Sequence, residues 1–379
     1  MISLAFHNGG LALGGHVVEG QTLLVADGRI TAIGPGLAIP TGFEPYDLKG
    51  DMLAAGYVDI QVNGGGGALF NDAPNVETIR TIAAAHARYG TTSLLPTLIS
   101  DDLDKVAEAI KAVDAAIEEG VPGIAGIHLE GPFLNASRKG VHDASKFKIL
   151  DQGAIDLLTS LKRGKTLITL APETAPGGAI AELVGRGAVV FAGHTEASFE
   201  QIIAAEAEGL RGFTHIFNAM SQLSSRAPGV VGAALSSPKS FSGLIADGVH
   251  VHPANMALVA RLLGPERTVL VSDAMPTLGS DRNWFDLKGE KIFARGLTCY
   301  TPEGVLAGSN LSMHDAVRVM MGEAGVSFAD AVRMATSAPA RAMGLEAEVG
   351  HLRVGARADF VRLGASVNLV QVWQGGVQV

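Results

Sequence analysis

Eight short apolar runs, rich in β-branched residues, recur along the middle of the chain. They cover residues 58–62, 92–96, 124–129, 166–170, 188–192, 213–217, 241–245 and 268–271. Runs of this length and composition are typical of buried strands, and helical patterns fill most of the gaps between them. Because a parallel barrel alternates strands and helices in this way, the pattern predicts an α/β fold of the (β/α)8 TIM-barrel type.

Two helices can be predicted from the gaps. The apolar positions of residues 103–117 recur at spacings of three and four, which is the period of an amphipathic helix. Ser198 and Gln201 form a capping box that opens another helix.

A doubly wound open sheet is the alternative architecture. Its dinucleotide-binding fingerprint does not follow the first run, because the glycines at 64–67 lead into Ala-Leu-Phe.

Both ends of the chain show strand-like alternation without a helical period. Near the start, a strand, the turn Asp27-Gly28 and a return strand predict a hairpin, and residues 359–363, 369–373 and 377–379 read likewise. An isolated hairpin is only marginally stable in water, so we expect the ends to pair. The predicted division is a small β-sandwich domain from residues 1–52 and 346–379, with the hydrolase barrel at 53–345.

Polar residues suited to a metal site follow several of the predicted strands. Glu130, His194 and His215 follow the third, fifth and sixth runs, and Asp273 follows the eighth. The carboxyl ends of barrel strands meet at one mouth, where active sites form. Two imidazoles and a carboxylate are a common catalytic zinc set, and Asp273 is the candidate general acid and base. Taken alone, each histidine could equally be a packed core residue. Asp273 alone could be the N-cap of the segment that follows it. The four together favour the metal site.

Eight further histidines divide into two groups. His142 and His250 fall in loops at the expected face of the barrel and are candidates for orienting a substrate. We assign surface or packing roles to six others, which are His7, His16, His86, His252, His314 and His351.

Composition narrows the class of protein. The formal net charge of −9 argues against a nucleic-acid or anionic-membrane partner, although one arginine can still bind a small anion. Cys299 is the only cysteine, which excludes an intrachain disulfide and favours a reducing compartment. The first residues lack the basic segment of a signal peptide, and no apolar stretch approaches the ~18 residues of a membrane span. We therefore expect a cytoplasmic enzyme.

Several motifs extend this picture to a known family. The distinctive segments are residues 55–64 (AGYVDIQVNG), 128–133 (HLEGPF), 170–173 (LAPE), 192–195 (AGHT), 214–220 (THIFNAM), 246–250 (ADGVH), 271–274 (VSDA) and 350–359 (GHLRVGARAD). With these segments the chain resembles, essentially end to end, the N-acetylglucosamine-6-phosphate deacetylases of the amidohydrolase superfamily. The segments at 128–133 and 214–220 are specific to that group, whereas the others are shared more widely.

The resemblance implies a role for each matching residue. Glu130, His194 and His215 would ligate one divalent metal ion per subunit, most often Zn2+, although the ligand set also suits Fe2+, Co2+ or Mn2+. Asp273 would serve as general base and then general acid. Arg226 would bind the 6-phosphate from the neighbouring subunit of a homodimer; without the resemblance it reads as a solvated loop charge. The implied substrate contacts are Val141, His142, Asn218, Ala219, Asp247, His250, Leu306, Ala307 and Gly308.

One motif departs from the wider superfamily. Many amidohydrolases carry His-x-His after the first strand and bind a second metal there, whereas this chain has Gln61 and Asn63. Amides are weak zinc ligands, so we predict one catalytic metal and regard Gln61 and Asn63 only as a possible second site.

The reaction implied by the resemblance is hydrolysis of N-acetylglucosamine 6-phosphate to glucosamine 6-phosphate and acetate, in amino-sugar catabolism. The alternative is deacetylation of a related N-acyl amino sugar, such as the galactosamine epimer or an unphosphorylated sugar. A non-catalytic homologue is a third reading, which the presence of all four candidate residues disfavours.

Overall fold

The computed structural model describes residues 3–379. Its centre is an eight-stranded parallel sheet with the order β17-β16-β15-β14-β13-β12-β11-β8. The strands are β8 (Tyr57–Val62), β11 (Thr91–Ile99), β12 (Gly126–Glu130), β13 (Lys165–Leu170), β14 (Val189–Ala192), β15 (Gly212–Phe213), β16 (Phe241–Leu244) and β17 (Thr268–Leu270). A parallel bridge between Val62 and Ala274 closes the sheet into a barrel. This confirms the predicted TIM barrel.

All eight predicted strands are present, and the sixth is much shorter than expected. The sixth run was predicted to extend over residues 213–217, but β15 ends at Phe213. The chain turns there, because His215 and Phe217 both have positive φ angles, of 33° and 77°, which strand geometry does not allow.

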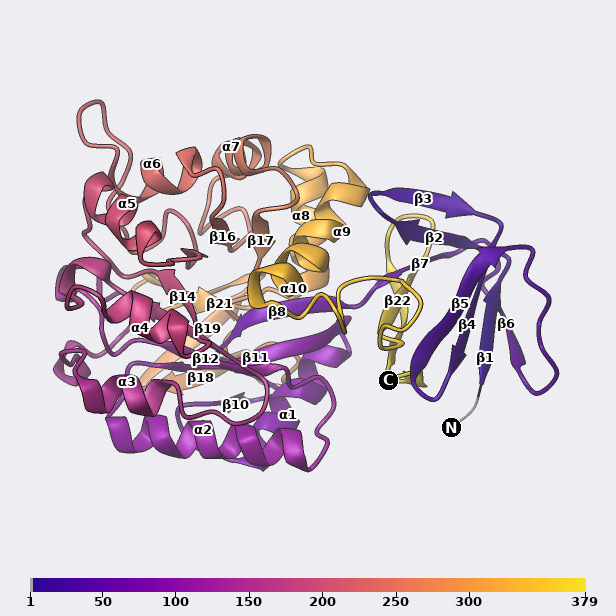
Figure 1. The fold of residues 1–379 in the computed structure, drawn as a ribbon, viewed down its shortest axis with the longest axis horizontal. Helices are drawn as coiled ribbons and strands as arrows, with labels where there is room; N and C mark the ends of the chain where they lie inside the picture. Colours follow the sequence, from indigo (N-terminus) through magenta and orange to yellow (C-terminus); the bar gives the residue numbers. More distant parts are fainter. Residues whose placement is uncertain (1–2) are drawn as a thin grey trace.

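Helices cover the outside of the barrel (Figure 1). Their bounds are α1 (Val76–Ala87), α2 (Leu103–Glu118), α3 (Gln152–Leu158), α4 (Ala179–Gly185), α5 (Phe199–Ala207), α6 (Gly229–Ser236), α7 (Pro253–Leu263), α8 (Met313–Gly322), α9 (Phe328–Ala335) and α10 (Ser337–Met343), with 3-10 turns at Ala136–Arg138, Ala144–Lys146 and Pro172–Thr174. Helix α2 matches the predicted amphipathic period, and both hydrogen bonds of the Ser198–Gln201 capping box open α5. No helix within residues 3–379 combines the length and apolar character needed to cross a membrane.

The two ends of the chain meet in two further sheets beside the barrel (Figure 1). A six-stranded sheet has the order β24-β23-β22-β7-β2-β3, and a four-stranded sheet has the order β5-β4-β1-β6. These strands are β1 (Leu4–His7), β2 (Gly10–Leu13), β3 (His16–Glu19), β4 (Gln21–Ala26), β5 (Arg29–Pro35), β6 (Glu44–Asp47), β7 (Met52–Ala55), β22 (Phe360–Leu363), β23 (Leu369–Gln374) and β24 (Val377–Gln378).

An aromatic cluster holds the sheets of the two ends together. The ring of Phe6 packs edge-on against Phe360 and Trp373, with centroids 4.9 and 5.2 Å away. Because Phe6 comes from the start of the chain and the other two from its end, this packing gives the hairpins the core that each lacks alone. Division of the chain at residues 52 and 345 remains a proposal.

An antiparallel sheet between β17 and α8 was not anticipated from the sequence. It consists of β18 (Trp284–Leu287), β19 (Glu290–Arg295), β20 (Thr298–Tyr300) and β21 (Leu306–Ser309), and it buries Phe285, Ile292 and Cys299. A small ribbon, β9 (Gly64–Gly65) with β10 (Ala68–Leu69), follows β8. The β18–β19 turn contacts the loop between β12 and α3, which we call the site loop. There, Lys288 Nζ donates a hydrogen bond to the Val141 carbonyl oxygen over 2.8 Å.

Candidate metal centre and catalytic carboxylate

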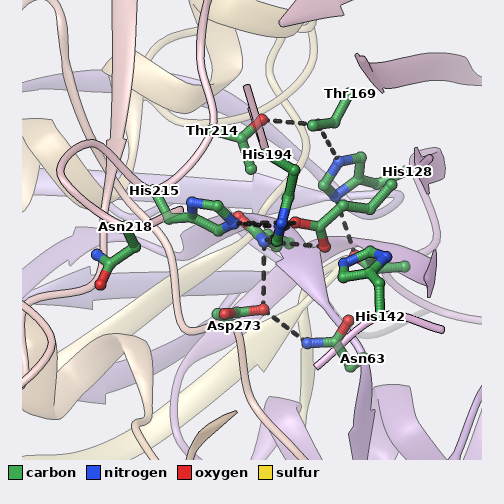
Figure 2. A network of polar contacts seen from close by, with 12 residues as sticks. Asn63, His128, His142, Thr169, His194, Thr214, His215, Asn218 and Asp273 are labelled. Atoms are coloured by element: carbon green, nitrogen blue, oxygen red, sulfur yellow. Dashed lines mark hydrogen bonds and ion pairs between the residues drawn. The ribbon is translucent and has the colours of Figure 1, made fainter. Parts of the chain in front are cut away.

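Three strand ends bring Glu130, His194 and His215 into one buried cluster. Glu130 is the last residue of β12, and the two histidines each lie two residues beyond a strand, after β14 and β15. His194 Nε2 and His215 Nε2 lie 3.1 and 3.0 Å from Glu130 Oε1, and 3.1 Å from each other. Figure 2 shows the two imidazole rings converging near Asp273.

The donor atoms of this cluster fit a divalent metal ion. Ligand atoms about 2.0–2.1 Å from a tetrahedral ion lie roughly 3.3 Å from each other, close to the spacing found here. His194 Nδ1 donates a hydrogen bond to the Arg138 carbonyl oxygen over 2.8 Å, so the neutral ring carries its proton on Nδ1. The bare Nε2 lone pair then faces a carboxylate oxygen and a second imidazole. A cation held between the three groups would suit this arrangement of donor atoms.

The electrostatics of the cluster favour a negative Glu130. Burial alone would raise the pKa of this carboxyl group, but the neighbouring imidazoles of His194 and His215 outweigh it and hold the pKa well below its usual range. Burial likewise opposes the charging of His215, and the contact with Glu130 outweighs it and raises the pKa of that imidazole. The site therefore attracts positive charge into a buried position, as a metal-binding site must.

Backbone strain is concentrated at these positions. His194, His215 and Asp273 have φ angles of 51°, 33° and 49°, a region that residues other than glycine seldom occupy. Each lies just past the end of a barrel strand. Strain of this kind is characteristic of functional sites.

Asp273 lies beside the cluster and is held by two amides. Asn63 Nδ2 donates to Asp273 Oδ1 over 2.6 Å, and Gln61 Nε2 donates to the same oxygen over 3.2 Å. Burial and then the nearby charge of Glu130 raise the pKa of Asp273 to about 6. A carboxylate with a pKa close to neutral can accept a proton and later return it, which fits the predicted role of general base and acid.

A fully buried carboxylate, Asp59, contacts the residue that precedes Asp273. Asp59 Oδ1 accepts hydrogen bonds from the backbone N–H groups of Gln61 and Ser272, and so joins β8 to the segment after β17. Burial raises its pKa to about 7. Sequence analysis did not assign a role to Asp59, because only the closed barrel brings these two segments together.

His142 is fixed in one tautomer beside the metal cluster. Its Nδ1 accepts a hydrogen bond from the backbone N–H of Ser100 over 3.3 Å, and the Ser100 hydroxyl lies 2.8 Å from the same atom. Burial and then the neighbouring His194 hold the pKa of His142 well below its usual value, so the ring is neutral. The proton of this neutral ring therefore lies on Nε2, which makes that atom a hydrogen-bond donor. Its ring centroid is 4.4 Å from that of His194.

A chain of hydroxyl groups supports the site, and sequence analysis missed it. His128 lies between Thr97 and Thr169, at 3.2 and 2.8 Å from their hydroxyl oxygens, and Thr169 contacts Thr214 over 2.6 Å (Figure 2). Burial lowers the pKa of His128 to about 4, so the ring is neutral. The threonines lie in strand patterns that are indistinguishable from ordinary barrel packing.

The predicted substrate contacts lie around this centre in different settings. Asp247 is buried and accepts a hydrogen bond from His250 Nδ1 over 2.5 Å, so it orients the imidazole and is not itself open to a ligand. Asn218 and Ala219 are half-buried in the turn after His215, and Figure 2 places Asn218 on the far side of His215 from the hydrogen-bonded network. Arg226 is exposed in the loop before α6.

The remaining predicted contacts lie on the unanticipated sheet and on the loop that it reaches. Leu306, Ala307 and Gly308 are in β21, whose last residue, Ser309, bridges to Ala274 beside Asp273. Gly308 has a φ of 115°, and a Cβ atom there would approach Met275 Cγ to 2.6 Å, so the backbone passes too close for a side chain. Val141 is half-buried and accepts the hydrogen bond from Lys288.

Together, the barrel, the Glu130–His194–His215 cluster and the adjacent Asp273 define the architecture of an amidohydrolase. The sequence model described as "Amidohydrolase family" matches residues 52–379, and the chain belongs to this family.

Individual relatives and solved structures extend the comparison. The chain is 40% identical to an N-acetylgalactosamine-6-phosphate deacetylase of Shewanella sp. (strain ANA-3), over 96% of this chain and 92% of that one. It is 32% identical to the N-acetylglucosamine-6-phosphate deacetylase of Haemophilus influenzae, over 87% of each. The crystal structure of N-acetylglucosamine-6-phosphate deacetylase from Pasteurella multocida superimposes with a TM-score of 0.94 at 31% identity, covering 100% of this chain and 99% of that one.

Proposed function

We propose that this chain hydrolyses the acetamide of N-acetylglucosamine 6-phosphate, giving glucosamine 6-phosphate and acetate. The observation that carries the proposal is the position of Asp273 beside the Glu130–His194–His215 cluster, at the mouth of a barrel that belongs to the amidohydrolase family. The names of the deacetylase relatives supply the substrate class.

Glu130, His194 and His215 would hold one divalent metal ion, for which we propose Zn2+. When bound, the metal supplies Lewis-acid polarisation of the acetamide carbonyl and activation of water. The protein residues transfer the protons and stabilise the developing negative charge. Asp273 accepts the proton of the attacking water, because its raised pKa makes it a competent base near neutral pH.

His142 and Asp273 complete the reaction. As negative charge develops on the carbonyl oxygen, the Nε2–H of neutral His142 donates a hydrogen bond to it. Asp273 then delivers its proton to the sugar nitrogen, so that the C–N bond breaks with a neutral amine as the leaving group. The accepted proton therefore ends on glucosamine 6-phosphate, and the water oxygen ends on acetate.

We propose that the sugar is held by Val141, Asn218, Ala219, His250 and the Leu306–Gly308 segment of β21. Asp247 orients His250 through its hydrogen bond. Arg226 lies exposed on its loop, where it is available to a neighbouring subunit, and we propose a homodimer in which it binds the 6-phosphate of the partner's substrate. A cytoplasmic location is also a proposal, supported by the single cysteine.

A second candidate substrate is N-acetylgalactosamine 6-phosphate. Two relatives carry this epimer in their names, at 40% and 36% identity, whereas the relatives named for the glucosamine sugar are 30–33% identical. The chemistry at Asp273 is the same for both epimers, since they differ only in the configuration of the 4-hydroxyl group.

The test is acetate release by purified, zinc-supplemented protein from both 6-phosphates and from both unphosphorylated sugars. We expect release from N-acetylglucosamine 6-phosphate, and negligible release without the phosphate. A kcat/KM at least tenfold higher for the galactosamine epimer would instead favour the second candidate. No release from any of the four sugars would refute the proposed function.

A further inference from the structure

We infer that Gln61 and Asn63 are positioning residues, whose amide N–H groups hold the Asp273 carboxylate in place without a second metal ion. The inference rests on the proposed function, in which Asp273 is the base. It agrees with the prediction of one catalytic metal and offers an alternative to a second metal site at these two residues.

The contacts of the two side chains carry the inference. Gln61 Nε2 lies 3.3 and 3.2 Å from the two carboxylate oxygens of Glu130 and 3.2 Å from Asp273 Oδ1. An amide NH2 group has two hydrogens, so one can serve each carboxylate. Asn63 Nδ2 adds the shortest contact, 2.6 Å to Asp273 Oδ1. Both amides are buried, with 2% of their surface exposed, so water does not compete for these donors.

The two amides offset the repulsion between the carboxylates of Glu130 and Asp273. Glu130 is a buried carboxylate and Asp273 a half-buried neighbouring one, and two such charges repel each other where little water screens them. A metal ion held by histidines at positions 61 and 63 would neutralise that repulsion. Here the N–H groups of Gln61 do so by bonding to both carboxylates at once, and hydrogen bonds to charged acceptors are the strong ones.

The orientation of the amides argues against metal ligation. A carboxamide binds a metal through its oxygen, whereas both side chains point their nitrogen atoms at the carboxylates. In this orientation the nitrogen atoms of both side chains face Asp273, and the Asn63 oxygen atom has no hydrogen-bond partner. The pair is therefore arranged to bind anions, and Asp273 is the anion that it binds.

The backbone keeps the amides in register with Asp273. The Asp273 N–H donates to the Gln61 carbonyl oxygen over 3.0 Å, and the Asn63 N–H donates to the Ala274 carbonyl oxygen over 3.1 Å. The strained φ of 49° leaves Asp273 without a regular strand to support it. These backbone bonds place the main chain of Asp273, and the two amide donors orient its carboxylate.

The first experiment separates kcat from KM. In Asn63→Leu and Gln61→Met, which keep side-chain volume but remove the donors, we expect kcat to fall by about 10- to 100-fold. KM should stay within threefold of wild type, because neither side chain is proposed to contact the sugar. Asn63→Asp keeps the shape of the residue while replacing the donor by an acceptor, so it should lose kcat to a similar extent even if a leucine is poorly tolerated.

Asn71→Leu is the matched control. Asn71 is also a buried asparagine, but its amide bonds to the backbone of Ile99 and to Asp101, away from Asp273. We expect it to lower the melting temperature and leave the kcat of the folded protein within threefold of wild type. A merely structural role for Asn63 would produce the same result in both variants.

The second experiment does not depend on activity. Titration of the metal-free protein with Zn2+ in a calorimeter should give one equivalent of tightly bound metal in the wild type and in both amide variants. A second equivalent in the wild type that is lost in Gln61→Met and Asn63→Leu would overturn the inference. An unchanged kcat in all three amide variants, or a rise in KM that accounts for the loss, would also overturn it. A wild-type protein that releases no acetate from any of the sugars identifies a failure of the proposed function instead.

Discussion

The backbone N–H of Ser100 donates a hydrogen bond to Nδ1 of His142, with the two nitrogens 3.3 Å apart. Because a backbone amide can only donate, Nδ1 must carry a lone pair, and the neutral imidazole therefore carries its proton on Nε2. Ser100 directly follows β11, whereas His142 lies in the long loop after β12. One main-chain contact between two loops thus decides which ring atom can donate to a substrate.

His142→Leu should lower kcat by about 100- to 1,000-fold, since it removes one donor to the developing oxyanion. Zinc content should be unchanged, because His142 is not in the ligand cluster. Steady-state kinetics and metal analysis of the same preparation check both expectations. Ser100→Ala is the control: it removes the hydroxyl group but keeps the backbone N–H, so its loss of kcat should be less than about tenfold. Equal losses in both variants would contradict the tautomer argument.

The pH dependence of kcat/KM should report Asp273. Burial and the charge of Glu130 raise the pKa of Asp273 to about 6, so below that pH the carboxyl group is protonated and cannot accept a proton. The rate should therefore fall about tenfold per pH unit below this value and level off above it. Kinetics over a range of buffers check this, with full activity after return to neutral pH as the control for unfolding.

Asp273→Asn keeps the shape of the side chain and removes the base. Turnover should fall by at least about 1,000-fold, while the protein still binds one equivalent of zinc. Activity within tenfold of the wild type would exclude Asp273 from the proposed role, and the acidic limb of the pH profile would then need another group.

Metal removal should abolish activity and lower stability together. Glu130 Oε1 contacts both histidines, so Glu130→Gln weakens the whole cluster and should reduce zinc affinity by at least about 100-fold. In the wild type, a chelator should lower the melting temperature, since metal bound only to the folded state at 100 times its Kd adds about 2.7 kcal/mol to stability. Calorimetry with and without chelator tests this, and an unchanged melting temperature would contradict it.

The sequence allowed prediction of the barrel because strand and helix periods are local properties. The eight runs were identified from residues a few positions apart, and the grouping of Glu130 with His194 and His215 followed from the rule that strand ends meet at one mouth. The same rule placed Asp273 near them. These predictions needed no knowledge of any particular contact between side chains.

The supporting contacts could not be predicted, because they join segments that are distant in sequence. The side chain of Asp59 meets the backbone of Ser272, and Thr169 meets His128, only when the barrel is closed. The β18–β21 sheet was missed because its short strands lie among loop-like residues, although it carries Gly308 and brings Lys288 to the site loop. The end of β15 was placed too far along because a positive φ at His215 leaves no hydrophobic signature.

The proposed role of Arg226 can be tested by mixing two inactive proteins. Arg226 is exposed on its loop before α6, and a guanidinium group there would serve the substrate phosphate of a neighbouring subunit. Arg226→Ala alone should raise KM for the phosphorylated sugar by about 100-fold or more and leave the slow hydrolysis of the unphosphorylated sugar unchanged. A similar loss on both sugars would contradict a phosphate contact.

Arg226→Ala and Asp273→Asn chains, each nearly inactive at low substrate, should complement each other when unfolded and refolded together. In a mixed dimer, the site of the Arg226→Ala chain retains its own Asp273 and receives Arg226 from the partner. Random pairing places such a site in about a quarter of all subunits, so about a quarter of the wild-type activity should return. Refolding each variant alone is the control. If Arg226 served its own subunit, no mixed dimer would contain a complete site, and activity would stay at the level of the two proteins refolded separately.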